Sequence, residues 1–310
     1  MHKIKKLWLP GYSGMLGSAL LRKFEKLNIK VLKTNSKNLD LLNYNKVFNF
    51  LKRNKPDTVV LCAAKVGGIY ANNTYPANFI FDNLKIEINV LDASRKNNVK
   101  KLLFIGSSCI YPKNSKQPIK EEYLLSGPLE KTNQWYALAK IAGLKMVESL
   151  RIQHKCNYIS IMPTNIYGIN DNFHSMDSHV VPALIKKINN AKINKKKHVK
   201  LWGTGKALRD LLFVDDLADA VILLIKKYNK LGHINCGSGK EISIKNLSKM
   251  IADILNFKGK IIFDKNYPDG TLKKKLDIAK IKKLGWKPKI SLRNGLIKTV
   301  DWYINKKDKL

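Results

Sequence analysis

Between a short apolar run and a helical stretch, the sequence reads Gly11-Tyr12-Ser13-Gly14-Met15-Leu16-Gly17. Glycine at every third position permits a tight turn, lets the backbone approach a pyrophosphate, and lets the helix pack closely on the strand. The helix N-terminus adds unpaired N–H donors and a positive dipole. A glycine-rich turn by itself is a weak signal, because many such turns only reverse the chain. Placed between a strand and a helix, this one predicts a site for the phosphates of a dinucleotide.

The segments around this turn alternate between strand-like and helical patterns. Strands are expected near residues 7–9, 31–32, 58–61, 101–106, 158–162 and 233–236, helices near 15–27 and 44–53, and a strand–helix unit at 211–227. Such alternation is typical of a parallel sheet with helices on both faces. The sequence therefore predicts an α/β fold built on a Rossmann-type, doubly wound parallel sheet.

The chain length and the loss of this pattern past Pro163 predict a second, smaller lobe. At 310 residues the chain exceeds one usual domain. The segment 191–197 is expected to be an exposed loop, and two helical stretches are expected after residue 241. We predict a dinucleotide-binding domain of residues 1–170 with 211–240, and a substrate-binding lobe of residues 171–210 with 241–310.

The strongly basic composition needs an explanation before any partner is inferred from it. The net charge is +35, but only six of the 58 basic residues are arginine, and lysine is scattered through a sequence crowded with Asn and Ile. These three residues share A- and T-rich codons. No helix-turn-helix, RNP or zinc-finger pattern accompanies the charge. The charge therefore favours solubility and nonspecific attraction of anions, and no specific nucleic-acid partner is expected.

The cysteines and the hydropathy pattern bear on the cellular location of the protein. Cys62, Cys109, Cys156 and Cys236 lie far apart without a C-x-x-C spacing, which argues against a zinc site or a disulfide framework. There is no apolar run of about 18 residues, and the first apolar run meets Pro10 too soon for a signal peptide. We predict a cytoplasmic protein with reduced thiols, no metal and no membrane partner.

The segment after the second expected strand bears on the choice of cofactor. An acid normally stands there to accept hydrogen bonds from the ribose hydroxyls of NAD. This chain has Lys33-Thr34-Asn35-Ser36-Lys37-Asn38 instead, whose cations and hydroxyls suit a 2′-phosphate. NADPH is therefore predicted, although Lys33 and Lys37 could equally be two more solvated lysines.

A second group of residues predicts carbonyl reduction. Tyr136 and Lys140 are four apart in a stretch with good helical propensity, so both project from one face. A nearby ammonium lowers a phenol pKa and can hold a nicotinamide ribose, which lets the tyrosine donate a proton to a carbonyl. The Y-x-x-x-K spacing alone occurs often by chance on surface helices. Ser107, directly after an expected strand, can polarise the same carbonyl, and together the three predict a reductase site.

These motifs resemble the extended short-chain dehydrogenases, and four longer stretches resemble the GDP-L-fucose synthase family within them. The stretches are AAKVGGI at 63–69, GSSCIYPK at 106–113, PTNIYG at 163–168 and SHVVPAL at 178–184. The resemblance runs from about Leu9 to Pro288. It implies an enzyme that converts GDP-4-keto-6-deoxy-D-mannose to GDP-L-fucose by epimerising C3 and C5 and reducing the C4 ketone with NADPH.

The resemblance also implies roles for particular residues. Cys109 and His179 become the base and acid of epimerisation, although alone they would be a small buried hydrophobe and a hydrogen-bonded loop histidine. Ser107, Tyr136 and Lys140 serve reduction, and the Ser and Tyr also stabilise an enolate. The residues implied for the cofactor are Gly11, Tyr12, Ser13, Gly14, Met15, Leu16, Gly17, Lys33, Asp40, Leu41, Ala63, Gly106, Ser107, Ser108, Lys140, Pro163, Thr164, Asn165, Ile166 and His179.

For the nucleotide-sugar substrate, the resemblance implies Lys187, Trp202, Arg209 and Asp277. An indole can cover a base or sugar, and arginine can grip a diphosphate with two hydrogen bonds. The alternatives are core packing for Trp202 and helix capping for Asp277. The family is typically dimeric, so a homodimer is expected.

Two departures from the family pattern weaken the prediction of NADPH. Ser13 stands where the family often has a basic residue, and Asn35 stands where it has an arginine. Three other readings of the whole chain remain: a related 4-keto reductase or epimerase on the same scaffold, a nonenzymatic Rossmann protein, and a nucleic-acid binder. Cys109 with His179 argues against the first, and the intact Ser107, Tyr136 and Lys140 argue against the others.

Overall fold

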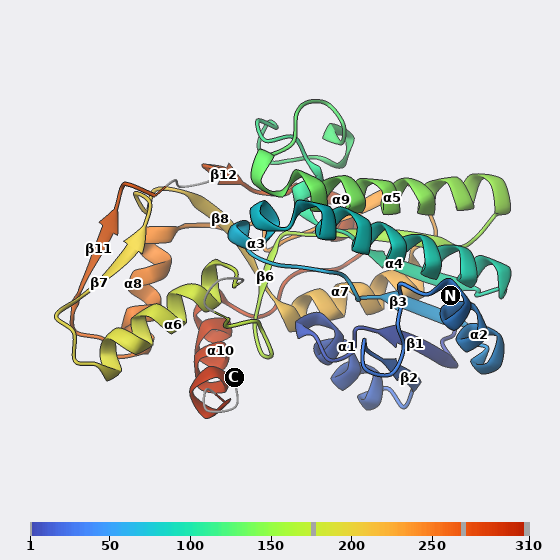
Figure 1. Cartoon of the computed structure of the whole chain (residues 1–310), viewed down its shortest axis with the longest axis horizontal. Helices are drawn as coiled ribbons and strands as arrows, with labels where there is room; N and C mark the ends of the chain where they lie inside the picture. Colours follow the sequence, from blue (N-terminus) through green and yellow to red (C-terminus); the bar gives the residue numbers. More distant parts are fainter. Residues whose placement is uncertain (1, 175–177, 268–270, 307–310) are drawn as a thin grey trace.

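A parallel six-stranded sheet forms the centre of the molecule, as the computed structural model shows for residues 2–174, 178–267 and 271–306 (Figure 1). The strand order is β2-β1-β3-β4-β5-β9. The bounds are β1 Lys6–Pro10, β2 Lys30–Thr34, β3 Thr58–Leu61, β4 Lys101–Ile105, β5 Tyr158–Pro163 and β9 His233–Cys236. Every neighbouring pair is parallel. The predicted α/β, doubly wound fold is confirmed.

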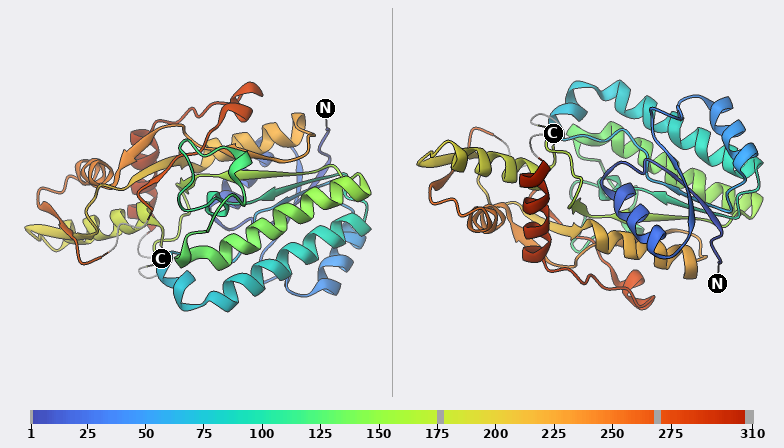
Figure 2. Two further views of the ribbon diagram at one scale, coloured as in Figure 1. Left: turned by 90° about the horizontal axis from the view of Figure 1, so that it is seen from above. Right: turned by 90° about the horizontal axis from the view of Figure 1, so that it is seen from below.

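Helices cover both faces of this sheet because its strands are apolar on both sides. On one face α1 (Met15–Lys26) packs on α7 (Val214–Lys227). On the other, α4 (Pro76–Lys96) lies between α2 (Tyr44–Asn54) and α5 (Gln134–His154) (Figure 2). The expected helices near 15–27 and 44–53 are confirmed within about two residues, as is usual for helix ends.

A smaller lobe extends from the carboxyl ends of the strands (Figure 1). Its strands are β6 Asn165–Tyr167, β7 His198–Trp202, β8 Leu208–Phe213, β10 Glu241–Ser243, β11 Lys260–Asp264 and β12 Lys273–Lys274. Strand β8 pairs with β6, β10 and β12, while β7 pairs with β11. The helices are α6 Val180–Ile193, α8 Ile244–Ile254 and α10 Leu292–Lys306. These elements bury a second hydrophobic cluster of their own.

The short elements near the interface of sheet and lobe carry several site residues. They are α3 Ile69–Thr74, α9 Ala279–Lys283 and three 3₁₀ turns, η1 Ser108–Ile110, η2 Glu121–Tyr123 and η3 Lys131–Asn133. In the described ranges, no helix is long and apolar enough to cross a membrane.

Two expectations about the lobe need correction. The segment 191–197 is not wholly an exposed loop, because α6 continues to Ile193 and buries Ala191 in the lobe core. Among the residues described after 241 there are three helices rather than the expected two, since α9 was too short to give a periodic pattern.

The two hydrophobic clusters do not follow the predicted domain boundaries at every residue. Tyr167 and Leu211 belong to the lobe cluster, whereas Leu276 and Trp286 pack into the sheet cluster. The predicted ranges also include 175–177, 268–270 and 307–310, which lie outside the described residues. The domain division stays a prediction.

Candidate active site

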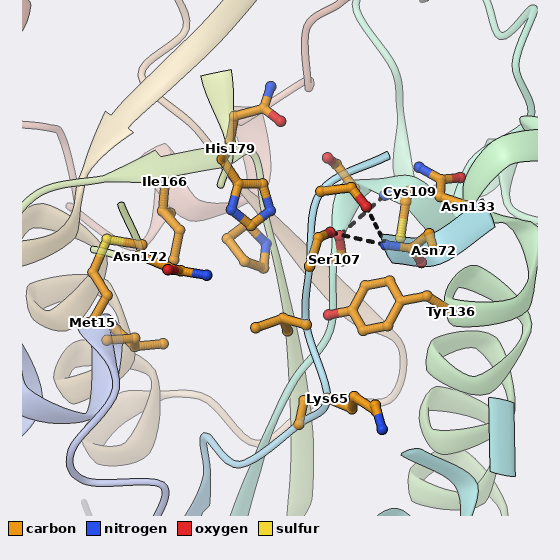
Figure 3. A pocket seen from close by; sticks show the side chains of 18 of the residues that line it. Met15, Lys65, Asn72, Ser107, Cys109, Asn133, Tyr136, Ile166, Asn172 and His179 are labelled. Carbon is orange, nitrogen blue, oxygen red and sulfur yellow. Dashed lines mark hydrogen bonds between the residues drawn. The ribbon is translucent and has the colours of Figure 1, made fainter. Parts of the chain in front are cut away.

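A cleft of about 1530 Å³ lies at the carboxyl ends of the sheet strands and reaches the lobe. Doubly wound sheets bind their ligands at this edge. Of the residues predicted for the cofactor, all but Tyr12 and Lys33 line this cleft. Figure 3 shows part of it, with side chains from the sheet edge facing side chains from the lobe.

The glycine-rich turn fits a pyrophosphate. Gly11 has a positive φ of 82°, and a Cβ there would lie 2.7 Å from the backbone nitrogen of Ala63. A Cβ on Gly17 would lie 2.0 Å from the carbonyl oxygen of Gly11, so helix α1 packs tightly on the turn. Helix α1 begins after Gly14 with no side-chain cap and no acidic residue in its first turn. Its first N–H groups and its dipole are therefore available to an anion.

Lys33 does not reach the cleft. Neighbouring residues of a strand point to opposite faces, and Thr34 is turned inward, where its hydroxyl accepts a hydrogen bond from the Trp8 indole at 2.9 Å. Lys33 therefore points the other way, with its ammonium 3.9 Å from Glu25. Asn35 and Ser36 line the cleft at this point.

The predicted reductase residues converge at the end of β4 (Figure 3). Ser107 caps the 3₁₀ turn η1, and its hydroxyl accepts a hydrogen bond from the backbone N–H of Cys109 at 3.3 Å. Tyr136 approaches from the first turn of α5, so its phenol lies on the same side of the cleft as Ser107. The ammonium of Lys140 lies 5.7 Å from the centre of the Tyr136 ring.

Cys109 and His179 face each other across the pocket (Figure 3). Cys109 is buried in η1 at 7% exposure, whereas His179 stands just before α6 on the lobe side. His179 is exposed and lines the cleft. The space between the two side chains can therefore take a sugar ring with one group above it and one below.

The pKa of Tyr136 is shifted in the opposite direction to the one expected from the sequence. Tyr136 has a pKa raised well above its usual value, first by burial and then by Cys109 and Glu87. The sequence led us to expect a pKa lowered by Lys140, and burial outweighs that effect. The phenol therefore keeps its proton at neutral pH, which is the state of a proton donor.

The other two reactive groups are also shifted by burial. Burial raises the pKa of the Cys109 thiol, and Lys274 is the leading opposing influence. Burial lowers the pKa of His179, so its imidazole is neutral at neutral pH. Lys274 was not singled out from the sequence, because it stands in a run of three lysines. The structure places it opposite Arg209 in the pairing of β12 with β8, and it lines the cleft.

Three of the four residues predicted for the nucleotide line the lobe side of the cleft: Lys187, Trp202 and Arg209. Trp202 is 60% exposed, which excludes the alternative of core packing. Its ring stacks on Tyr267 with centroids 4.5 Å apart, and the Lys187 ammonium lies 4.4 Å from its centre.

Asp277 does not line the cleft in this structure. Its carboxylate accepts a hydrogen bond from the backbone N–H of Ala279 at 2.7 Å, just before α9. This contact stands at the start of the helix, but the N-cap residue of α9 is Ile278 rather than Asp277. Within the described part of the chain, no group of three or more His, Cys, Asp or Glu side chains could hold a metal ion.

The fold and the Ser–Tyr–Lys arrangement define a dinucleotide-dependent dehydrogenase or epimerase. Residues 8–237 match the model of the NAD dependent epimerase/dehydratase family. Within it, the chain belongs to the GDP-L-fucose synthase family. GDP-L-fucose synthase 1 from Arabidopsis thaliana is 50% identical over 304 residues, which cover 97% of this chain and 94% of that protein. The resemblance predicted from the four sequence stretches is confirmed.

Solved structures agree with this assignment. A GDP-L-fucose synthetase from Naegleria fowleri bound to NADP has a TM-score of 0.91 and 26% identity, covering 99% of this chain and 96% of that one. A GDP-mannoheptose C4 reductase from Campylobacter jejuni with NADP bound has a TM-score of 0.90 and 36% identity, covering 98% and 99%. Both neighbours therefore bind the phosphorylated dinucleotide.

Proposed function

We propose that this chain is an NADPH-dependent epimerase and reductase that converts GDP-4-keto-6-deoxy-D-mannose to GDP-L-fucose. One observation carries the proposal: Ser107 and Tyr136 share a single pocket with Cys109 and His179, which face each other across it. The first two suit reduction of a ketone, and the second two suit proton transfer on opposite faces of a sugar. Incubation with this substrate and NADPH, followed by NMR of the product, tests the proposal directly.

NADPH supplies a hydride when it is bound. The turn Gly11–Gly17 with the N-terminus of α1 holds its pyrophosphate, and Lys140 holds its nicotinamide ribose. The fit rests on the uncapped helix end and the close approach that glycine allows at the turn. These residues set the position of the cofactor and leave proton transfer to Tyr136.

Epimerisation precedes reduction because only hydrogens next to the ketone are acidic enough to exchange. Cys109, as a thiolate, removes a proton from C3 or C5, and His179, as an imidazolium, gives a proton to the opposite face of the same carbon. Solvent then takes the proton from the Cys109 thiol and restores the one that His179 has given up. The negative charge of the enolate develops on the C4 oxygen, where the hydroxyls of Ser107 and Tyr136 donate hydrogen bonds. Two such exchanges invert both carbons.

Reduction of the C4 ketone then uses the same two hydroxyls. Tyr136 gives its proton to the C4 oxygen as that oxygen gains charge, and Ser107 orients the carbonyl. Because burial raises the pKa of Tyr136, the phenol holds its proton until the oxygen becomes basic enough to take it. Water afterwards returns a proton to the tyrosine.

The lobe binds the nucleotide part of the substrate. Arg209 and Lys187 suit the diphosphate, and Trp202 presents an exposed ring edge to the base or ribose. Asp277 stays a proposed member of this set through the family resemblance, and in the structure its carboxylate accepts a hydrogen bond from Ala279 at the start of α9.

A preference for NADPH over NADH is the first prediction, supported by the absence of an acid after β2. We expect Asn35→Asp to lower kcat/KM for NADPH by about tenfold or more, since a carboxylate there repels a 2′-phosphate and suits a diol. The control Lys30→Ala, at the exposed start of β2, should change it by less than about twofold. A wild type that prefers NADH would contradict the assignment.

A 4-keto reductase without epimerase activity is the second candidate. It is favoured by the likeness to the GDP-mannoheptose C4 reductase, whose fold covers nearly the whole chain. Exchange of hydrogen at C3 and C5 separates the two functions, since a simple reductase needs none.

We also propose that the chain forms a homodimer through the outer faces of α4 and α5. Phe81 and Ile88 on α4 and Trp135 and Leu138 on α5 are exposed, and the two helices lie side by side (Figure 2). Exposed apolar patches of this kind mark interfaces. Light scattering should give twice the mass of one chain, and Phe81→Lys should reduce it to one. A wild type with the mass of a single chain would contradict the proposal.

A cytoplasmic location is proposed as well. The support is the four cysteines, all of which are free thiols in the structure. Reduced thiols are typical of cytosolic proteins.

A further inference from the structure

Helix α4 carries a buried carboxylate that the proposed reaction does not use. Glu87 is 1% exposed, and its Oε1 lies 3.1 Å from Nζ of Lys140, whose side chain is 3% exposed. Both charges lie between the sheet and the α4–α5 pair. A carboxylate buried to this degree is costly unless a positive group compensates it. Burial raises the pKa of Glu87, and Lys140 is the group that opposes this rise.

The surroundings of Lys140 fix the direction of its ammonium. Nζ donates a hydrogen bond to the carbonyl oxygen of Ile105 at 3.2 Å and lies 4.8 Å from the centre of the Phe104 ring. An ammonium has three N–H donors. The ammonium therefore lies between the carboxylate of Glu87 and the carbonyl of Ile105, at a point where Lys140 also lines the cleft.

The opposing helix is shaped around the carboxylate. A Cβ on Gly143 of α5 would lie 2.4 Å from Oε2 of Glu87 and 2.5 Å from Cζ of Phe104. Glycine in the middle of a helix costs stability relative to alanine. The glycine at position 143 leaves space for the carboxylate of Glu87 beside Lys140. Lys140 lies about one helical turn before Gly143 on α5.

We propose that Glu87 is a positioning residue, which holds the Lys140 ammonium charged and directed at the nicotinamide ribose and Tyr136. This inference rests on the proposed function, because it assigns Lys140 to cofactor binding. The other titratable groups that act on this pair are Tyr136 on α5, Cys109 in η1 and Cys62 after β3. Burial raises the pKa of Cys62 to about 12, so its thiol stays neutral.

Removal of the carboxylate changes the response to pH in a definite direction. In Glu87→Gln the ammonium of Lys140 stays in a poorly solvated site and loses the carboxylate that lies 3.1 Å from it, so a buried charge is left without its counter-charge. The alkaline limb of kcat/KM for reduction should therefore move down by about one pH unit or more. A purely structural role for Glu87 would lower activity equally at all pH values.

The test compares wild type, Glu87→Gln, Gly143→Ala and the control Glu122→Gln. Glu122 in η2 pairs with Lys120 at 3.6 Å outside the cleft, so the control removes a carboxylate from another ion pair. NADPH affinity is read by fluorescence titration from pH 6 to 9, and reduction is read as a pH profile. We expect the dissociation constant for NADPH at the alkaline end to rise by about tenfold or more in Glu87→Gln and to stay unchanged in Glu122→Gln.

Gly143→Ala provides a second route to the same result. Alanine favours the helix, but its Cβ must displace both the Glu87 carboxylate and the buried Phe104 ring. Circular dichroism checks that this variant folds, and a folded variant should still show the shifted limb. It carries the test if Glu87→Gln does not fold. The inference would be overturned if a folded Glu87→Gln, or a folded Gly143→Ala, kept both the wild-type alkaline limb of the pH profile and the wild-type affinity for NADPH. A wild type that binds NADPH but acts on no 4-keto sugar would instead overturn the proposed function, and the titration would still decide the role of Glu87.

Discussion

Tyr136→Phe is expected to lower kcat for reduction of the 4-keto sugar by about 10³-fold, because positioned proton donors contribute 10² to 10⁴ in rate. Only the phenol oxygen is removed. Lys140 and the glycine turn remain, so the affinity for NADPH should change little. Oxidation of NADPH in the presence of substrate measures the first quantity, and fluorescence titration measures the second.

The matched control is Tyr44→Phe on α2, which removes a phenol that donates to Asp92 at 2.9 Å, away from the cleft. Its turnover should equal that of the wild type. Near-normal turnover in Tyr136→Phe would refute the assignment of this residue as proton donor, and with it the reductase site.

Cys109→Ser and His179→Gln are expected to suppress hydrogen exchange at C3 and C5 by about 10² to 10⁴. In deuterated water and without NADPH, the wild type should exchange both positions, since each exchange needs only deprotonation and reprotonation. A serine hydroxyl is a far weaker base than a thiolate, and glutamine cannot donate as an acid. Mass spectrometry or NMR of the recovered sugar measures the deuterium content.

The pH dependence of this exchange follows from the thiol and the imidazole. Because burial raises the pKa of Cys109, the thiolate is a minor species at neutral pH. Burial lowers the pKa of His179, so its acid form becomes rarer as the thiolate becomes more common with increasing pH. The exchange rate of the wild type should therefore change little between the two pKa values, whereas the residual rate of His179→Gln should climb with pH. Cys156→Ser, at the end of α5 and outside the cleft, should exchange like the wild type.

With NADPH present, the same variants should make a different product. A protein that cannot epimerise can still reduce the unepimerised ketone, which gives a 6-deoxyhexose of different stereochemistry. If both single variants exchanged deuterium as fast as the wild type, the assignment of Cys109 and His179 would fail. The chain would then be the simple 4-keto reductase considered as the second candidate.

The parts of this protein that could be predicted from sequence are those whose signal is local. The glycine turn, the Tyr136–Lys140 spacing and the serine after β4 each depend on a few consecutive residues. Strand and helix patterns then determine which edge of the sheet carries them. The fold and the proximity of Ser107 to Tyr136 follow from these local patterns.

Other features depend on contacts between distant segments. Glu87 is one acid in the middle of a long helix, and only the packing of α4 on α5 reveals its partner. Lys274 is one of three consecutive lysines, and only the pairing of β12 with β8 brings it to the cleft. The outward direction of Lys33 is likewise visible only in the structure, where the hydrogen bond from Trp8 shows that Thr34 points inward.

The pKa of Tyr136 shows a different limit of sequence reasoning. The spacing to Lys140 correctly indicated a nearby cation, but the loss of solvent around the phenol depends on the whole pocket. Desolvation opposes the charged form more strongly than one ammonium supports it. A motif can therefore identify which groups meet without giving the sign of their net effect.

The 3₁₀ turn η1 has a consequence for how this enzyme can diverge. Ser107 and Cys109 stand two residues apart on one turn, and in the proposed function Cys109 serves epimerisation alone, whereas Ser107 serves both epimerisation and reduction. A single codon change at Cys109 removes carbon acid chemistry and leaves the hydroxyl of Ser107, the β4 strand and helix α5 in place. The reverse loss, of reduction without epimerisation, would also remove hydroxyls that stabilise the enolate. Descendants of such a protein can lose epimerisation in one step, whereas they cannot lose reduction alone so easily.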